Sequence, residues 1–265
     1  MKTSLEVQKV MALAQNMRKT ALKMAFECGE PAHIGGGLSM IEILATLYGH
    51  VMQNPGLDDR FILSKGHGVL GLYSALYETG FMNDEDISTF QSNGSKFIAH
   101  PIMNHDVRIE SSNGSLGQGL SMAVGIALAY KKRNNSNRVF VILGDGECYE
   151  GSVWEAAITA TEQNLDNLTV VVDCNGHQND GAVSSRMTYQ NLMNKWSGFG
   201  WKSILCDGHN ISALIDGIES EHEGMPKAII ARTIKGYGVE FMENNNEWHH
   251  NRLSQRLYEE AIKNL

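Results

Sequence analysis

Two oxygen-bearing side chains in the sequence each follow an apolar run. Asp145 comes directly after the β-branched run 139–144, and Asn175 ends the run 168–175, thirty residues beyond the aspartate. A carboxylate and an amide oxygen are hard ligands, which suit Mg²⁺ or Ca²⁺ and suit zinc poorly. Because two side chains cannot complete an octahedron, a bound Mg²⁺ would take its other ligands from water, backbone carbonyls or phosphate oxygens. The pair therefore predicts a metal that holds a phosphorylated ligand.

The chain between these residues has the pattern needed to bring them together. Residues 152–163 are predicted to form a helix, so that 139–175 make a βαβ unit with parallel strands and a right-handed crossover. Ligands bind at the carboxyl ends of parallel strands, where Asp145 and Asn175 would meet. The alternative for the GDG sequence alone is an ordinary Asp-Gly turn, with the asparagine as a cap. The position of the asparagine at the end of the second strand favours the metal site.

Further elements extend this unit to an α/β domain. Apolar residues recur every three or four positions in 4–27, which predicts an amphipathic helix whose methionines pack in the core. Apolar helices are predicted at 40–52 and 69–80, and a buried strand at 227–234. With 4 prolines and no linker-like segment, the expected fold is a single domain, 1–265, built as a parallel β-sheet flanked by helices.

The composition excludes several classes of partner. The net charge of −8, from 22 basic and 30 acidic residues, gives no reason to expect nucleic acid or an anionic membrane. The N-terminus lacks the apolar segment of a signal peptide, and no apolar run approaches the roughly 18 residues of a membrane span. Four cysteines without CxxC spacing indicate a reduced, cytoplasmic protein whose thiols serve packing.

The motifs together resemble those of a known enzyme family. GDG followed about thirty residues later by Asn is the fingerprint of thiamine diphosphate enzymes, and GDGECYEGSVWEAAI closely resembles its transketolase version. Six further motifs occur in transketolase order along nearly the whole chain: AHIGGGLS, SKGH, AHP, NGSLGQG, TIKGYG and WHH. The resemblance implies the thiamine diphosphate-binding (PP-domain) fold. It also implies that Asp145, Asn175 and the backbone carbonyl of His177 bind Mg²⁺, with Ca²⁺ as a substitute.

The resemblance implies further contacts to thiamine diphosphate. Gly146 is expected to approach the diphosphate through its N–H, next to Glu147, while Gly114 and Leu116 contact the aminopyrimidine and the thiazolium. Lys235 matches a basic residue that some relatives place near the cofactor. For this lysine, a solvated position in a loop is the alternative.

Four histidines match those that surround the reactive carbon of the cofactor in transketolases. Imidazoles that titrate near neutral pH can transfer protons and donate hydrogen bonds to sugar hydroxyls. The resemblance assigns His100 to the donor hydroxyls, His33 and His249 to proton transfer or carbonyl polarisation, and His67 to both cofactor and substrate, with His249 also near the cofactor. His250 stands where glycine is usual, which leaves open which of the last two histidines enters the site.

The expected partner follows from the same resemblance. Transketolases carry a pyrimidine-binding domain and a C-terminal domain after this region, and the glutamate that activates the cofactor lies in the former. This chain is therefore expected to be the N-terminal subunit of a split transketolase, inactive alone, and to assemble two-plus-two (α2β2) with a second chain. A phosphorylated donor ketose is the default expectation. The identity of that ketose and of the acceptor aldose stays open, as does central or specialised sugar metabolism.

Three other functions compete with this one. An α subunit of a 2-oxo acid dehydrogenase (E1) also binds thiamine diphosphate and needs a partner, but the SKGH, LGQG and WHH motifs belong to the ketol-transfer branch. A non-catalytic cofactor-binding or scaffolding subunit would not need the four histidines. A Mg²⁺-dependent phosphate-ester hydrolase would act without thiamine diphosphate.

Glu150 matches an interface glutamate of the family, which meets its symmetry mate or relays protons between sites. A helix N-terminal glutamate stabilised by the helix dipole is the alternative. We expect Glu150→Gln to impair two-plus-two assembly or turnover, measured by analytical ultracentrifugation and ketol-transfer rates, whereas Glu155→Gln, inside the predicted helix that follows, leaves both unchanged. Equal behaviour of the two variants would favour the dipole role.

Overall fold

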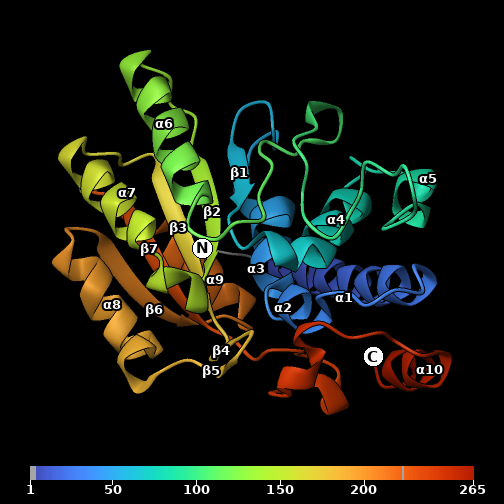
Figure 1. Ribbon diagram of the computed structural model, residues 1–265. Helices are drawn as coiled ribbons and strands as arrows, with labels where there is room; N and C mark the ends of the chain where they lie inside the picture. Colours follow the sequence, from blue (N-terminus) through green and yellow to red (C-terminus); the bar gives the residue numbers. More distant parts are fainter. Residues whose placement is uncertain (1–3, 223) are drawn as a thin grey trace.

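A five-stranded parallel sheet forms the centre of the computed structural model, which describes residues 4–222 and 224–265. The strand order is β1-β2-β3-β7-β6, and every neighbouring pair is parallel (Figure 1). The strands are β1 (Arg60–Leu63), β2 (Val139–Gly144), β3 (Leu168–Cys174), β6 (Lys202–Asp207) and β7 (Lys227–Arg232). The α/β class and the parallel sheet predicted from the sequence are confirmed.

Helices cover both faces of this sheet (Figure 1). One face carries α1 (Ser4–Glu27), α3 (Ile41–Thr46), α4 (Val69–Glu78) and α9 (Ile211–Glu219), and the other carries α6 (Gly119–Lys132), α7 (Gly151–Glu162) and α8 (Tyr189–Gly198). The remaining short elements include α2 (Ile34–Leu38), α5 (Asp84–Ser88), α10 (Gln255–Lys263) and the antiparallel pair β4 (His177–Gln178) and β5 (Gly181–Ala182).

The two helical layers explain why the central strands are apolar along most of their length. All residues of β2 and β3 are buried, because successive side chains point to opposite faces and both faces are covered. Val141 packs with α6, α7 and α8, whereas its neighbour Ile142 packs with the α1, α3 and α4 layer. The sheet thereby separates two hydrophobic clusters and presents its strand ends to ligands.

Most predicted elements are confirmed in place. The predicted helix 4–27 is α1, the helix predicted at 152–163 is α7, and the βαβ unit is β2-α7-β3 with parallel strands. One core assignment is wrong: Met11 of α1 is 57% exposed, although its neighbours Val10 and Ala14 are buried.

Strands β1 and β6 were not predicted. β1 has four residues, too few for a distinct pattern, and β6 is an edge strand with mixed burial whose sequence KSILCD alternates polar and apolar residues only in part. The predicted helix 40–52 divides into α3 and a π-helical turn, Leu47–Val51.

One helical stretch corrects the expectation about membrane-spanning length. Ile34–Val51 covers 18 residues at a mean hydropathy of 1.2, which by length and composition alone suffices to cross a membrane. Of this stretch, 89% is buried inside the fold. Its apolar character is therefore accounted for by the core between α1 and the sheet.

We expect the two helical layers to make central strand residues far more sensitive to truncation than edge residues. Ile230 of β7 is fully buried, whereas its register partner Leu205 on β6 is 37% exposed. Ile230→Ala should lower the free energy of unfolding by about 2–5 kcal/mol, because it leaves a cavity. Leu205→Ala should cost about 1 kcal/mol or less. Urea unfolding followed by circular dichroism measures both, and similar losses would contradict this division.

Candidate functional site

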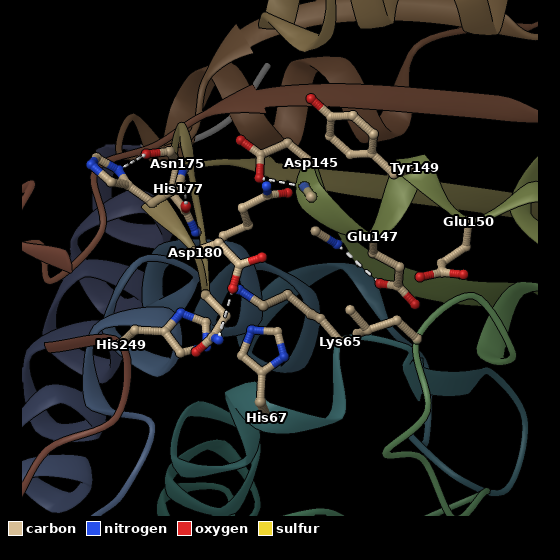
Figure 2. Close-up of a pocket in the computed structure, with 15 residues that line it drawn as sticks. Lys65, His67, Asp145, Glu147, Tyr149, Glu150, Asn175, His177, Asp180 and His249 are labelled. Carbon is tan, nitrogen blue, oxygen red and sulfur yellow. Dashed lines mark hydrogen bonds between the residues drawn. The ribbon is translucent and has the colours of Figure 1, made fainter. Parts of the chain in front are cut away.

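A cavity of about 280 Å³ lies at the carboxyl ends of β2 and β3. Figure 2 shows Asp145 and Asn175 on the strand side of this pocket, with His67 and His249 across from them. The lining residues come from segments far apart in the sequence: Lys65, His67, Leu116, Gly144, Asp145, Gly146, Glu147, Tyr149, Glu150, Asn175, His177, Gln178, Asn179, Asp180 and His249. The predicted metal residues thus meet His67 and His249 in this pocket, whereas the other two predicted histidines, His33 and His100, are not among its lining residues.

Asp145 enters the pocket as a buried carboxylate that is bonded to backbone groups. Its two oxygens accept the backbone N–H groups of Gly146 and Gly176, each at 2.7 Å. Burial, and then the charge of nearby Asp173, raise the pKa of Asp145 to about 7 despite these bonds. A divalent cation beside the carboxylate would offset both effects.

Asn175 is oriented so that its oxygen is the available ligand. Its Nδ2 donates to Asp173 Oδ2 at 3.1 Å and to Ser39 Oγ at 3.3 Å. Its Oδ1 accepts the N–H of His177 at 3.1 Å, which leaves a second lone pair for a metal. The imidazole of His177 is turned back, with Nδ1 3.0 Å from the Asn175 carbonyl oxygen.

The donor set fits a metal that depends on a phosphorylated ligand. Within residues 4–222 and 224–265, no group of three or more His, Cys, Asp or Glu side chains could hold a metal by itself. One carboxylate and one amide oxygen at adjacent strand ends leave most of an octahedral sphere to other ligands. Diphosphate oxygens would complete it.

A buried ion pair beneath the pocket was missed by the sequence reasoning. Lys65 donates to Asp173 and to the carbonyl oxygen of Gly36, and the side chains of this lysine and aspartate are 1% and 0% exposed. Asp173 also accepts hydrogen bonds from Ser39 and Thr233. Burial acts to raise the pKa of Asp173, but Lys65 and these donors hold it below its usual value. Two features of the sequence could have indicated this ion pair, namely the lysine within the SKGH motif and the aspartate two residues before Asn175.

Lys235 is buried beside His249 and is not a solvated loop lysine, although it is not among the residues that line the pocket. Its side chain is almost fully buried, and its Nζ lies 2.9 Å from Asn246 Oδ1 and 2.8 Å from His249 Nδ1. Burial, and then the charge of Lys65, lower its pKa to about 8. Lys65 therefore lines the pocket as the partner of Asp173, and Lys235 contacts the lining residue His249.

The four predicted histidines form one cluster, and His250 is a fifth member. The ring centre of His33 lies 5.6 Å from those of His67 and His100, 5.4 Å from that of His249 and 4.5 Å from that of His250. His67 and His249 are stacked at 5.4 Å. Both histidines of the WHH motif thus belong to the cluster. His249 lines the pocket, whereas the ring of His250 lies next to that of His33.

Burial and neighbouring charges lower the pKa values of the four predicted histidines, which disfavours their protonated forms. Burial, and then mutual repulsion with His250, lower the pKa of His33 to about 3. Burial and the charge of Lys235 lower the pKa of His249 to about 4, and burial with Lys65 lowers that of His67 well below its ordinary value. Neutral imidazoles offer one donor and one acceptor each, a chemistry suited to sugar hydroxyls.

The other predicted cofactor residues lie around the pocket in different ways. Leu116 and Gly146 line it, whereas Gly114 does not and lies beside His100, where an added Cβ would be 3.7 Å from the His100 ring. Glu147 lines the pocket but uses its carboxylate within the protein, accepting from Ser64 Oγ at 2.5 Å and from the N–H of Gly117 at 2.8 Å. It therefore holds the loop that carries Leu116.

Glu150 stands at the rim of the pocket. It is exposed and precedes α7, and its side chain makes no capping hydrogen bond to that helix. Asn179, also at the rim, donates to Asp180 and accepts at its carbonyl from Asn246. An exposed carboxylate beside the pocket leaves the interface role of Glu150 a prediction.

Comparisons with known proteins agree with this geometry. The family described as "Transketolase, thiamine diphosphate binding domain" matches residues 11–264. An apulose-4-phosphate transketolase subunit from Actinobacillus succinogenes is 40% identical over 225 residues, which cover 82% of each chain. The 6-deoxy-6-sulfo-D-fructose transketolase subunit SqwG of a Clostridium species is 38% identical over 260 residues, covering 95% of this chain and 94% of the relative.

Solved structures show the same fold within a longer chain. The transketolase from Leishmania mexicana superposes with a TM-score of 0.85 at 26% identity, covering 96% of this chain and 41% of that chain. By sequence comparison, human transketolase is 34% identical over 272 residues, which cover 97% of this chain and 42% of the relative. The chain thus spans less than half the length of these transketolases and most of the length of the two subunits.

We expect His33 and His249 to stay uncharged in the folded protein from neutral pH down to about pH 5, because their folded pKa values are lowered. In the unfolded chain, histidines gain protons as the pH falls through about 6.5. Because the unfolded state then binds more protons, these residues contribute stability that is complete above about pH 6.5 and is lost as the pH falls towards their folded pKa values. Imidazole ¹⁵N shifts of the folded and urea-unfolded chain test this, and coincident titration curves would contradict it.

Proposed function

The chain belongs to the family of transketolase thiamine diphosphate-binding domains, and from this premise we propose that it is the cofactor-binding subunit of a split transketolase. In this proposal it transfers a two-carbon ketol unit from a ketose to an aldose once it is paired with a second subunit. The observation that carries the proposal is the pocket in which Asp145 and Asn175 face His67 and His249, two members of a cluster of five histidines.

Asp145, Asn175 and the carbonyl of His177 would hold Mg²⁺, and the metal would hold the diphosphate of thiamine diphosphate. Bound there, the cofactor supplies the nucleophilic carbon and the electron sink that cleavage next to a ketose carbonyl requires. The amide of Asn175 is fixed by Asp173 and Ser39, which keeps its oxygen directed to the metal position. Lys65, which is paired with Asp173, lines the same pocket, and buried Lys235 contacts the lining residue His249.

The histidines would bind and orient the sugar. His100 and His33 donate to or accept from hydroxyls, and His67 and His249 stand between the substrate and the cofactor. A neutral imidazole can take up a proton from a hydroxyl and return it in the same turnover. The ring centre of His250 lies 4.5 Å from that of His33, so this histidine would restrict access of the sugar to His33 more than the glycine that is usual there.

A phosphorylated or otherwise anionic sugar is the proposed substrate class. Lowered pKa values disfavour the charged forms of the four predicted histidines, and both buried lysines are already engaged with Asp173, Asn246 or His249. The anionic end of the sugar would therefore be bound by the second subunit. Two similar subunits are named for apulose-4-phosphate and 6-deoxy-6-sulfo-D-fructose, both of which carry such an end.

The second subunit would supply the pyrimidine-binding and C-terminal domains, in a two-plus-two complex. The description of similar chains as transketolase subunits and the coverage of 41% of a longer transketolase support this division. Residues 1–265 would then be one PP domain. An E1-type α subunit would share the metal site but lacks a use for five clustered histidines, which favours ketol transfer.

The test is to purify the tagged chain from its host with whatever subunit accompanies it. Ketol transfer is then assayed with and without thiamine diphosphate and Mg²⁺, using phosphorylated ketoses and aldoses. We expect Asp145→Ala to lower the affinity for Mg²⁺ and cofactor by at least about a hundredfold, since even groups that only orient metal ligands reach that range.

Asp166→Ala is the matched control, because this aspartate is exposed and pairs with Lys131 on the surface. It should leave binding and turnover unchanged. A homo-oligomer that binds no thiamine diphosphate would overturn the proposal, and decarboxylation of a 2-oxo acid in place of ketol transfer would favour the E1 alternative.

A further inference from the structure

A buried polar network away from the pocket has no part in the function described so far. It joins Arg18 of α1, Glu42 of α3 and His209, which lies in the turn after β6. The three side chains are between 8% and 9% exposed. Burying an ion pair costs desolvation energy that apolar side chains in the same place would not cost. The contacts that the network makes with the rest of the chain therefore point to a role beyond packing.

The hydrogen bonds of His209 fix its tautomer. Its Nε2 accepts the backbone N–H of Ile234 at 2.9 Å, so this nitrogen carries no proton. Its Nδ1 lies 2.9 Å from Glu42 Oε2 and therefore donates to that carboxylate. Burial acts to raise the pKa of Glu42, but the bonds from His209 and Arg18 lower it, which keeps the carboxylate ionised as the acceptor.

The network holds the loop 233–238 at two points. His209 takes the N–H of Ile234, and Arg18 Nε donates to the carbonyl oxygen of Tyr237 at 3.1 Å. The rings of His209 and Tyr237 are stacked, with centres 3.5 Å apart and planes at 16°. The loop is thus fixed on both sides of Lys235.

The same loop is tied to the pocket at its other contacts. Thr233 donates to Asp173, and the N–H of Gly236 donates to the carbonyl oxygen of Gly35 at 3.0 Å. Gly238 has φ of +87°, and a Cβ there would lie 2.5 Å from Arg18 Nε, so the loop passes against the network with no space for a side chain. Lys235 reaches inward, to Asn246 and His249.

We propose that His209 is a positioning residue of the cofactor site, whose unprotonated Nε2 sets the loop 233–238 and thereby places Lys235 and His249. The inference rests on the proposed function, because it assigns to this loop the binding of thiamine diphosphate. His209 is not among the residues that line the pocket. Its effect passes through the backbone of Ile234 to the next residue, Lys235.

Two substitutions separate positioning from packing. In His209→Gln, the amide oxygen reaches the place of Nε2 and can still accept from Ile234 N–H. In His209→Asn, the shorter amide reaches the place of Nδ1, so it can donate to Glu42 but leaves Ile234 N–H without an acceptor. Both lose the ring that stacks on Tyr237, so a purely structural role would weaken both alike.

The measurement uses the chain with its accompanying subunit. Thiamine diphosphate affinity is read from the shift of the melting temperature with cofactor concentration, and turnover is measured at saturating cofactor. We expect His209→Asn to weaken cofactor binding by about tenfold, the loss of roughly one hydrogen-bonded contact, with turnover at saturation largely kept. His209→Gln should bind within about threefold of the wild type, and the control His50→Asn, whose histidine contacts Glu219 away from the pocket, should be unchanged.

A second measurement does not depend on the variants folding. Long-range ¹H–¹⁵N spectra of the wild-type chain report which nitrogen of His209 is protonated, and the inference requires Nδ1. Protonation at Nε2, or equal loss of cofactor affinity in the Asn and Gln variants, would overturn it. A wild-type complex that fails to bind thiamine diphosphate would instead overturn the proposed function, so the two failures are distinguishable.

Discussion

The ion pair between Lys65 and Asp173 is the interaction on which the site depends. Lys65 follows β1, Asp173 lies near the end of β3, and their partners Gly36, Ser39 and Thr233 come from two further segments. Removing one member of such a buried pair leaves an uncompensated charge, at a cost of about 3–5 kcal/mol. The pair and its hydrogen bonds therefore hold three segments together at the end of β3: α2, the loop after β1 and the loop after β7.

This arrangement gives two neighbouring aspartates opposite properties. Asp173 has a lysine and several donors and is stable as an anion, whereas Asp145, at the end of the adjacent strand, accepts from backbone N–H groups and has a raised pKa. The charge of Asp173 contributes to that rise. The carboxylate of Asp173 thus holds several segments of the protein together. The charge of the Asp145 carboxylate is not balanced in this way, and a metal that prefers oxygen ligands would stabilise it.

The histidine side of the pocket follows a similar principle. Burial, repulsion within the cluster and the two lysines all lower the pKa values of the imidazoles, so the rings remain donors and acceptors of hydrogen bonds. Lys235 contributes to the lowered pKa of His249 because its Nζ contacts the ring of that histidine. The loop that carries Lys235 is itself bonded to Arg18 through the carbonyl oxygen of Tyr237. The pocket therefore has oxygen ligands for a cation at the ends of β2 and β3, and imidazoles that can hydrogen-bond to hydroxyl groups on the loops that face them.

The centre of the sheet and the chemistry of the site could be predicted from the amino-acid sequence. Continuous β-branched runs, helical periodicity and the Asp145–Asn175 spacing identified β2, α7 and β3, because these signals are local and the strand ends of a βαβ unit must share an edge. The motif resemblance also named the histidines that the fold brings together. Short or half-exposed strands such as β6 gave no comparable pattern.

Roles that depend on distant contacts emerged from the folded chain alone. Lys65 is an ordinary loop lysine in the sequence, and its burial follows from a partner 108 residues away. The resemblance predicted Lys235 near the cofactor, but its contacts with Asn246 and His249 come from the folding of the chain that follows it. Both His249 and His250 reach the cluster, because the Ala32–Asn251 bridge lays that segment beside His33. Burial and long-range pairing are properties of the packed chain, and no local pattern encodes them.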